Sequence, residues 1–323
     1  MDNLSIESLV CRAMHCDSIV ASETIQSLWS GYGKIIRMVL PPTADAASVI
    51  VKQIAPPGAG AANPRGWSGD ISHNRKLRSY LVECNWYCDW AGQFDVRCRI
   101  AKCHAVDEHA GRRVIVLEDL DASGYPRRCS HLTDRQLHAC LRWLANFHAT
   151  FMGRLPNGLW DNGTYWHLET RPREWAAMKD GPLKAAAAMI DQRLSTCRFK
   201  TLVHGDAKVA NFCFADFEDE VAVVDFQYVG GGCGMKDVAY FLGSCLSDDE
   251  CARREEECLD IYFRELRSRI DSSIAVELER EWRELFPFAW ADFHRFLCGW
   301  CATHPKLTPY SREMVDRALA GSP

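Results

Sequence analysis

Residues 201–229 read TLVHGDAKVANFCFADFEDEVAVVDFQYV, and this stretch decides the fold of the chain. Two short apolar runs flank a polar turn at 215–220, which is typical of a hairpin. Antiparallel pairing about that turn places residue 211 opposite roughly residue 224. Asn211 opens the first strand and Asp225 closes the second. The stretch therefore predicts that these two side chains lie side by side.

An amide oxygen held beside a carboxylate suits a hard cation such as Mg²⁺, so we expect Asn211 and Asp225 to be metal ligands. Taken alone, Asp225 is equally explained as a strand-end residue that caps a turn. Just upstream, a strand TLV ends in His204, and Asp206 precedes Asn211 by five residues. The whole pattern is H-x-D-x-K-x-x-N with an Asp 14 residues after the Asn. Kinases use this set of groups for phosphoryl transfer.

The pattern gives a catalytic role to Asp206, Lys208 and His204. Asp206 would accept the proton of an acceptor hydroxyl, because phosphoryl transfer needs a positioned base. Lys208 is either a contact to the transferring phosphate or a solvated loop lysine. His204 is interpreted as a brace for the catalytic loop more than as a participant in the chemistry.

Three segments resemble the kinase-like small-molecule phosphotransferases typified by aminoglycoside phosphotransferases and choline kinases. They are LVHGDAKVANFCF at 202–214, VAVVDFQYVGGGCGMKDVAYFL at 221–242 and VIVLEDL at 114–120. The resemblance is closest to the ecdysteroid kinase-like branch. It implies an α+β, bilobal protein-kinase-like fold with ATP in the cleft between the lobes. The expected lobes are a small β-rich N-lobe, residues 1–120, and a larger mainly helical C-lobe, residues 121–323.

The resemblance also implies a lysine on the third strand that pairs with a glutamate on the following helix. Lys52, in SVIVKQI, and Glu83 fit these positions, and Lys52 would hold the α- and β-phosphates. The backbone of Glu118 and Leu120 would bind adenine. The phosphate-covering loop, Ser30-Gly31-Tyr32-Gly33, is a poor match to the G-x-G-x-x-G of protein kinases.

Apolar periodicity and turn residues predict strands in the first part of the chain and helices in the second. Two capping-box signatures, Thr133 with Gln136 and Ser247 with Glu250, mark helix starts. The expected elements are two strands within 25–40 joined at 31–33, strands at 48–54 and 113–117, a loop at 55–69, and a helix at 70–91.

Several segments allow two interpretations. The glycine run 230–234 is either a flexible stretch beside the acceptor site or a plain loop before a helix that starts near Met235. Asp237 is either a helix cap or a bracing residue. The aromatic segment 282–300 is more typical of core than of an acceptor pocket, and Pro287 predicts that it forms two helices. His148 is expected to be a satisfied core histidine.

Composition excludes several classes of protein. The chain has 323 residues and a formal net charge of −5, which argues against a protein built to coat nucleic acid. No run approaches 18 consecutive apolar residues, and the N-terminus lacks the pattern of a signal peptide. The 16 cysteines are too few for a disulfide scaffold, so we expect free thiols and a cytoplasmic protein.

The function predicted from these observations is ATP- and Mg²⁺-dependent phosphorylation of a hydroxyl on a small-molecule alcohol. Two alternatives remain open at this stage: a catalytically silent kinase-like ligand-binding protein, and a protein kinase. The absence of H-R-D and A-P-E signatures disfavours the protein kinase. The acceptor is open among aminoglycosides, choline-like alcohols, sterol-like alcohols and sugars, and the sequence does not indicate the oligomeric state.

Overall fold

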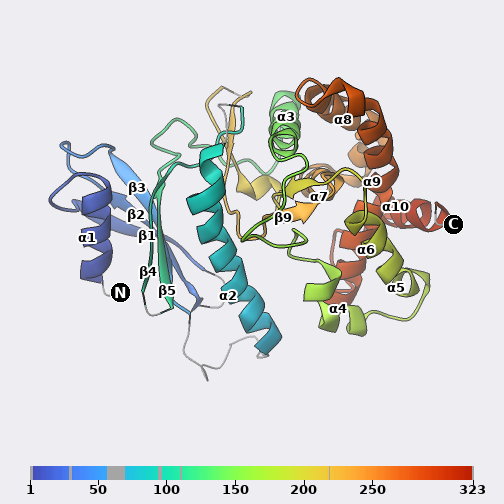
Figure 1. The fold of residues 1–323 in the computed structure, drawn as a ribbon, viewed down its shortest axis with the longest axis horizontal. Coiled ribbons are helices and arrows are strands. Elements are labelled where there is room, and N and C mark those ends of the chain that lie inside the picture. The colour runs from blue at the N-terminus through green and yellow to red at the C-terminus, as the bar shows by residue number, and fades with distance from the viewer. Residues whose placement is uncertain are drawn as a thin grey trace. The chain divides into compact units, whose positions relative to one another are not determined.

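The computed structural model describes residues 3–28, 31–56, 70–93, 97–109, 111–217 and 219–321. The chain divides into two compact units (Figure 1). The first unit comprises Met1–Gln93 and Ile100–Arg127, and the second comprises Phe94–Arg99 and Arg128–Pro323.

The first unit is built on one antiparallel five-stranded sheet with the strand order β1-β2-β3-β5-β4. Strands β2, β3 and β5 are rich in β-branched and aliphatic residues, which favour strands, whereas β1 is exposed along its length. The elements of this unit are α1 (Asn3–Ala13), β1 (Ala21–Ser27), β2 (Gly33–Val39), β3 (Ser48–Ile54), α2 (Asp70–Asn85), the π-helix η2 (Trp86–Trp90), the 3₁₀ turn η3 (Ala91–Gln93), β4 (Cys103–His109) and β5 (Arg112–Glu118).

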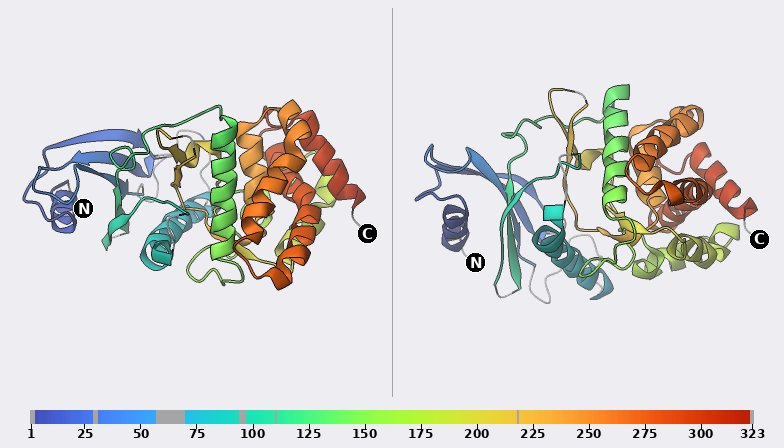
Figure 2. Two further views of the ribbon diagram at one scale, coloured as in Figure 1. Left: turned by 90° about the horizontal axis from the view of Figure 1, so that it is seen from above. Right: turned by 45° about the horizontal axis from the view of Figure 1, so that its top comes forward.

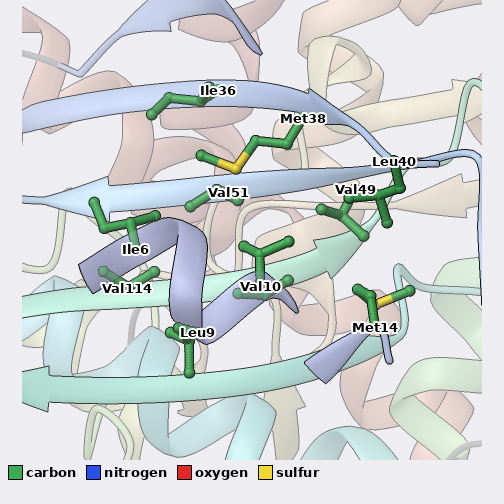
Figure 3. Packing of buried hydrophobic residues seen from close by; sticks show 11 residues of the cluster. Ile6, Leu9, Val10, Met14, Ile36, Met38, Leu40, Val49, Val51 and Val114 are labelled. Atoms are coloured by element: carbon green, nitrogen blue, oxygen red, sulfur yellow. The ribbon is translucent and has the colours of Figure 1, made fainter. Parts of the chain in front are cut away.

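Helix α1 covers one face of this sheet (Figure 3). Its apolar side chains, among them Ile6 and Val10, pack on Val49 and Val51 of β3 and on neighbouring strands. Successive side chains of a strand point to opposite faces, so Lys52 lies on the face away from α1. That face receives α2, whose Glu83 contacts Lys52.

Most of the predicted elements of the first unit are confirmed. The strand at 48–54 is β3, the strand at 113–117 lies within β5, and the helix at 70–91 is α2 continued by η2. The strand β4 and the helix α1 were not predicted, since β4 mixes polar and apolar residues and is only half-buried. The predicted loop at 55–69 falls outside the described residues from 57 onward.

The second unit is mainly helical, and its short strands form two separate pairs, β6 with β9 and β7 with β8. Helix α3 lies against α8, and α9 lies against α7 and α10 (Figure 2). The elements are α3 (Asp134–Thr150), η4 (Leu168–Thr170), α4 (Pro172–Ala177), α5 (Pro182–Ala185), α6 (Ala187–Ser195), β6 (Thr201–Val203), η5 (Val209–Asn211), β7 (Phe212–Phe214), β8 (Val221–Val223), β9 (Gly230–Gly232), α7 (Met235–Cys245), α8 (Asp248–Arg267), α9 (Ser272–Trp300) and α10 (Pro309–Ala320).

Both predicted capping boxes are confirmed. Thr133 and Gln136 exchange side-chain and backbone hydrogen bonds at the start of α3, and Ser247 and Glu250 do the same at α8. Each box satisfies two N–H groups that the helix itself leaves without partners.

The prediction that Pro287 separates two helices is wrong. Helix α9 runs unbroken from Ser272 to Trp300 with Pro287 inside it. An internal proline costs about 3 kcal/mol, because it lacks an N–H and crowds the preceding turn. The aromatic side chains on both sides of it are buried, and their burial offsets that cost. The expectation that these aromatics form core is confirmed, with Trp300 partly exposed.

The glycine run is neither a flexible stretch nor a plain loop. Gly230–Gly232 is the buried strand β9, which pairs with β6. A Cβ atom on Gly230 would lie 2.2 Å from the Trp160 carbonyl oxygen, so only glycine fits beneath that segment. Helix α7 begins at Met235, as predicted.

Within the part of the chain that the structure describes, none of the helices has both the length and the apolar character needed to cross a bilayer.

Candidate active site

The predicted hairpin is present with the predicted register. Strands β7 and β8 pair Phe212 with Val223, and the Val224 N–H donates to the Asn211 carbonyl at 3.1 Å. Asn211 therefore lies directly opposite residue 224, and Asp225 follows at the end of the strand. The polar turn between two apolar runs was sufficient to predict this register.

The loop that carries Asp206 is anchored by Asp237, the third residue of α7. The backbone N–H groups of His204 and Gly205 donate to its two carboxylate oxygens at 2.5 Å and 2.9 Å. Gly205 has a φ of +78°, and a Cβ there would lie 2.2 Å from the Tyr228 carbonyl oxygen, so this turn requires glycine. Of the two interpretations of Asp237, the bracing role is the one that the structure shows.

His148 supports this anchor from α3. Its Nε2 lies 3.2 Å from Asp237 and its Nδ1 lies 2.7 Å from the Tyr262 hydroxyl, with the ring fully buried. The expectation of a satisfied core histidine is confirmed.

His204 braces the same loop with both nitrogens of its ring. Its Nδ1 accepts from the Asp206 N–H at 3.2 Å, so its Nε2 carries the proton and donates to the Val224 carbonyl at 3.1 Å. The ring is buried against Phe226. Because neither nitrogen is left for a reacting group, His204 is a positioning residue in this structure.

Asp206 is a buried carboxylate with one oxygen bound and one left without a partner. Its Oδ2 accepts from Lys208 Nζ at 2.8 Å and from Asn211 Nδ2 at 3.3 Å. Its Oδ1 is buried and has no hydrogen-bond partner among the described residues. Burial raises the pKa of Asp206 above its ordinary value, Lys208 opposes this, and the Asp225 charge adds to it. A carboxylate held in this way is a stronger base than one in water.

Lys208 is tied to this carboxylate and is partly open to solvent. Burial lowers the pKa of its ammonium, but the charge and hydrogen bond of Asp206 outweigh burial and raise it overall. Its side chain is 38% exposed, so the charged ammonium lies where the site is open to solvent.

Asn211 and Asp225 supply the oxygen donors expected for Mg²⁺. Asn211 Nδ2 donates to the Asp206 carbonyl at 2.7 Å, and both hydrogen bonds of this side chain come from Nδ2, so its Oδ1 remains for a ligand. Asp225 has a left-handed backbone, with φ at +71°, and accepts from Gln227 at 3.2 Å. Amide and carboxylate oxygens are the donor chemistry of Mg²⁺. The described residues hold no group of three or more His, Cys, Asp or Glu that could bind a metal.

The first unit contains the predicted ion pair of Lys52 with Glu83. Lys52 Nζ donates to Glu83 Oε2 at 2.6 Å, and both side chains are buried. Strand β3 and helix α2 bring together residues that are 31 positions apart. This lysine on a largely buried strand is therefore not directed to solvent but is held by a buried carboxylate.

A comparison with protein-family models identifies the relatives of this chain. The ecdysteroid kinase-like family matches residues 78–154 and 166–272, more than half of the chain. The chain belongs to the ecdysteroid kinase-like family. The match contains Glu83 in the first unit and the whole loop and hairpin from His204 to Asp225 in the second. A search of curated proteins found no match.

Solved structures that resemble this ecdysteroid kinase-like chain show the same fold at low identity. One, described as an aminoglycoside phosphotransferase from Ralstonia eutropha JMP134, has a TM-score of 0.55 and 14% identity over 99% of this chain and 95% of its own. An amicoumacin kinase in complex with AMP-PNP and Ca²⁺ has a TM-score of 0.52 and 13% identity, over 99% and 92%. The GDP complex of aminoglycoside 2'-phosphotransferase-IIIa has a TM-score of 0.50 and 11% identity, over 99% of each chain. The fold is that of kinase-like phosphotransferases.

The two residues predicted to bind adenine lie at and just after the end of β5. The Glu118 N–H donates to the Lys102 carbonyl at 2.8 Å, and its side chain accepts from the Lys102 N–H at 2.9 Å. The Leu120 carbonyl accepts from the Tyr125 N–H at 2.8 Å. A contact of Leu120 with adenine would therefore use its N–H. Of the phosphate-covering loop, Ser30 lies outside the described residues.

Three residues on which the Asp206 charge acts were not predicted from the sequence. Tyr165 and Tyr240 place their hydroxyls 3.1 Å apart, and the pKa of each is raised by burial and then by the Asp206 charge. The Tyr165 N–H also donates to the Gly205 carbonyl at 3.4 Å. Lys306 is the third, since the Asp206 charge acts on its ammonium as well. These residues are 34 to 100 positions from Asp206 and follow no motif, so no spacing in the sequence connects them to it.

Proposed function

We propose that this ecdysteroid kinase-like protein transfers the γ-phosphate of ATP to a hydroxyl of a small-molecule alcohol in a Mg²⁺-dependent reaction. The observation that carries the proposal is the carboxylate of Asp206. One of its oxygens is fixed by Lys208 and Asn211, and the other is buried without a partner. A purely structural carboxylate would have both oxygens bonded, because an unsatisfied buried acceptor is costly.

In the proposed reaction, Asp206 Oδ1 accepts the proton of the acceptor hydroxyl. The hydroxyl oxygen forms a bond to the γ-phosphorus while the bond from that phosphorus to the bridging oxygen of ADP breaks. The products are a phosphate monoester, ADP and a proton held on Asp206. Asn211 keeps the base oriented, and Lys208 offers positive charge to the transferring phosphoryl group.

Asn211 and Asp225 would hold Mg²⁺ through Oδ1 and the carboxylate. The ion would neutralise charge on the nucleotide phosphates, which is its usual contribution to phosphoryl transfer. Lys52, fixed by Glu83, would hold the α- and β-phosphates, and the backbone of Glu118 and Leu120 would bind adenine. The GDP and AMP-PNP complexes of structures with this fold support a nucleotide as the donor.

The test is phosphate transfer from ATP to a library of alcohols, followed by mass spectrometry and ³¹P NMR, with and without Mg²⁺. We expect a phosphate monoester to form with at least one acceptor, and chelation of Mg²⁺ to abolish it. Formation of no phosphorylated product, together with no ADP release above background, would contradict the proposal.

The metal assignment has its own test in Asp225→Asn. Asparagine tolerates the left-handed backbone at this position, so the fold is expected to remain intact. We expect a loss of about 10³-fold in kcat, or a large rise in the Mg²⁺ concentration needed for half-maximal rate, because one charged ligand is lost. The matched control is Asp216→Asn, an exposed carboxylate in the turn of the same hairpin, which should leave the Mg²⁺ dependence unchanged.

A further inference from the structure

Cys11 and Cys16 lie at the two ends of the turn that closes helix α1, outside the candidate active site. The Cys16 N–H donates to the Cys11 carbonyl at 3.0 Å, and His15 has a left-handed backbone with φ at +51°. A hydrogen bond from the sixth residue back to the first, with a left-handed residue just before the donor, is the Schellman motif that ends many helices.

The Schellman motif brings the side chains of its two end residues together, usually in apolar contact, and here both are cysteines. A disulfide requires that the two α-carbons lie within about 7 Å of each other. A main-chain hydrogen bond of 3.0 Å between the same two residues meets this requirement, because only one or two covalent bonds separate each α-carbon from the bonded atoms. The thiols also interact, since burial raises the pKa of the Cys11 thiol and a hydrogen bond with Cys16 raises it further.

The turn is anchored in the first unit, and its thiols are partly exposed. The Asp45 N–H donates to the Met14 carbonyl at 3.2 Å, and the Asp45 carboxylate lies 2.8 Å from His15 Nδ1. Cys16 packs against the core that α1 forms with the sheet. Because these contacts hold the turn in place, the two thiols stay together in the folded chain and remain within reach of a small oxidant.

We propose that Cys11 and Cys16 form a reversible disulfide that locks the C-terminal turn of α1. The reaction is thiol–disulfide exchange with a low-molecular-weight disulfide. One cysteine attacks this oxidant as its thiolate and releases one thiol, and the other cysteine then attacks the mixed disulfide and releases a second thiol. The protein loses two protons and two electrons, which reduce the oxidant to the two thiols. The inference does not depend on the proposed function, because α1 covers the sheet face away from Lys52.

The test uses the full chain, with oxidised glutathione as the oxidant. Free thiols are then blocked with N-ethylmaleimide, and the monomeric chain is denatured and digested with trypsin without reduction. Arg12 separates the two cysteines, so cleavage yields one peptide that ends at Arg12 and a second peptide, 13–34, each with one cysteine. Mass spectrometry finds the two peptides joined only if the disulfide has formed, and dithiothreitol should release them.

Two variants of His15 test whether the turn, and not closeness in the sequence alone, brings the thiols together. Asparagine tolerates the left-handed backbone, whereas the β-branched valine does not. His15→Asn should therefore form the disulfide as the wild-type protein does, and His15→Val at least about tenfold more slowly. Cys11→Ser and Cys16→Ser should give no joined peptides, and the control Cys88→Ser, which removes an exposed cysteine, should leave the reaction unchanged.

We expect the joined peptides to exceed the mixed glutathione disulfides of Cys11 and Cys16 by at least about tenfold, because closure is intramolecular. Since the pKa of the Cys11 thiol is raised, formation at neutral pH should take minutes to hours. The disulfide restricts the unfolded chain, so Tm should rise by about 2–5 °C, and Cys16→Ser should abolish this rise.

Three results would overturn the inference. The first is the formation of mixed glutathione disulfides at both cysteines without joined peptides. The second is an equal rate of disulfide formation in His15→Asn and His15→Val, which would show that the turn does not bring the thiols together. The third is an unchanged Tm when the joined peptides have formed, which would show that the disulfide does not lock the turn.

Discussion

The two lysine–carboxylate pairs of this protein, one in each unit, are built differently. In the first unit, Lys52 and Glu83 meet at 2.6 Å, with side chains that are 8% and 1% exposed. In the second, Lys208 and Asp206 meet at 2.8 Å, but Lys208 is 38% exposed and Asp206 keeps a buried oxygen without a partner. The first pair is almost fully buried, whereas the second leaves Asp206 Oδ1 available to a reacting group.

The two pairs therefore have opposite effects on the stability of the folded state. Breaking a closed buried pair leaves an uncompensated charge in the interior, so Lys52 and Glu83 depend on each other for stability. A raised pKa means that the folded state disfavours the charged form, so the ionised Asp206 costs stability at neutral pH. Residues that reduce stability in this way are typical of functional sites.

The largest expected effect is that of Asp206→Asn on catalysis. This nearly isosteric change removes the proposed base, and we expect kcat to fall by about 10³-fold. The free energy of unfolding at neutral pH should stay the same or rise, because a costly buried charge is removed. Rates are measured by coupled ADP release and stability by urea denaturation. If Asp206→Asn loses stability and keeps its rate, Asp206 contributes to stability and not to catalysis, which is the opposite of what the comparison predicts.

Next in size is the effect of Lys52→Met. The variant leaves the Glu83 carboxylate buried without its cation, and we expect a loss of about 3–5 kcal/mol in the free energy of unfolding. We also expect a loss of about 10²-fold in kcat/KM for ATP, because a charged contact to the phosphates disappears. The double variant Lys52→Met with Glu83→Leu should regain stability but not activity, whereas recovery of both would show that the pair is structural only.

A smaller effect is expected from Asp237→Asn, which changes the anchor of the catalytic loop. The amide keeps one acceptor oxygen, so one of the N–H groups of His204 and Gly205 then faces an NH₂ group. We expect kcat to fall about tenfold through displacement of Asp206, with little change in KM, and stability to fall by about 1–3 kcal/mol. The same change can be made in the Asp206→Asn background. If Asp237→Asn lowers kcat by the same factor there as in the wild-type protein, the anchor does not act through Asp206.

The smallest expected effect concerns pH. The proposed base must be ionised, so we expect activity above the pKa of Asp206 and its loss as pH falls through that pKa. Because burial raises this pKa, the acid limb should lie above that of an ordinary carboxyl group. Lys208→Met removes the ammonium that opposes this shift and should move the limb to still higher pH. A limb that moves to lower pH in this variant would show that Lys208 does not stabilise the ionised base.

Local patterns in the sequence were enough to predict the parts of the site that are close together along the chain. The hairpin turn fixed the register that joins Asn211 to residue 224, and the capping residues fixed the starts of α3 and α8. The pairing of Lys52 with Glu83 followed from a family resemblance, and the geometry agrees with it.

The parts that the sequence did not predict depend on contacts between distant segments. Tyr165, Tyr240 and Lys306, on which the Asp206 charge acts, lie in three separate segments, and none of them has a spacing that points to Asp206. Pro287 was expected to end a helix because its local cost is visible in the sequence, whereas the burial of its aromatic neighbours is not. The glycine run looked like a loop for the same reason, since its partner β6 lies far away in sequence.

Strand β9, which consists of glycines alone, limits the substitutions that this part of the chain can accept. The segment from Trp160 to Gly163 rests directly on its main chain, with Gly163 N–H donating to the Gly231 carbonyl at 2.8 Å, and leads into Tyr165. One methyl group on Gly230 would lift that segment and carry Tyr165 away from the base. We therefore expect libraries that vary the glycines of β9 to yield inactive clones.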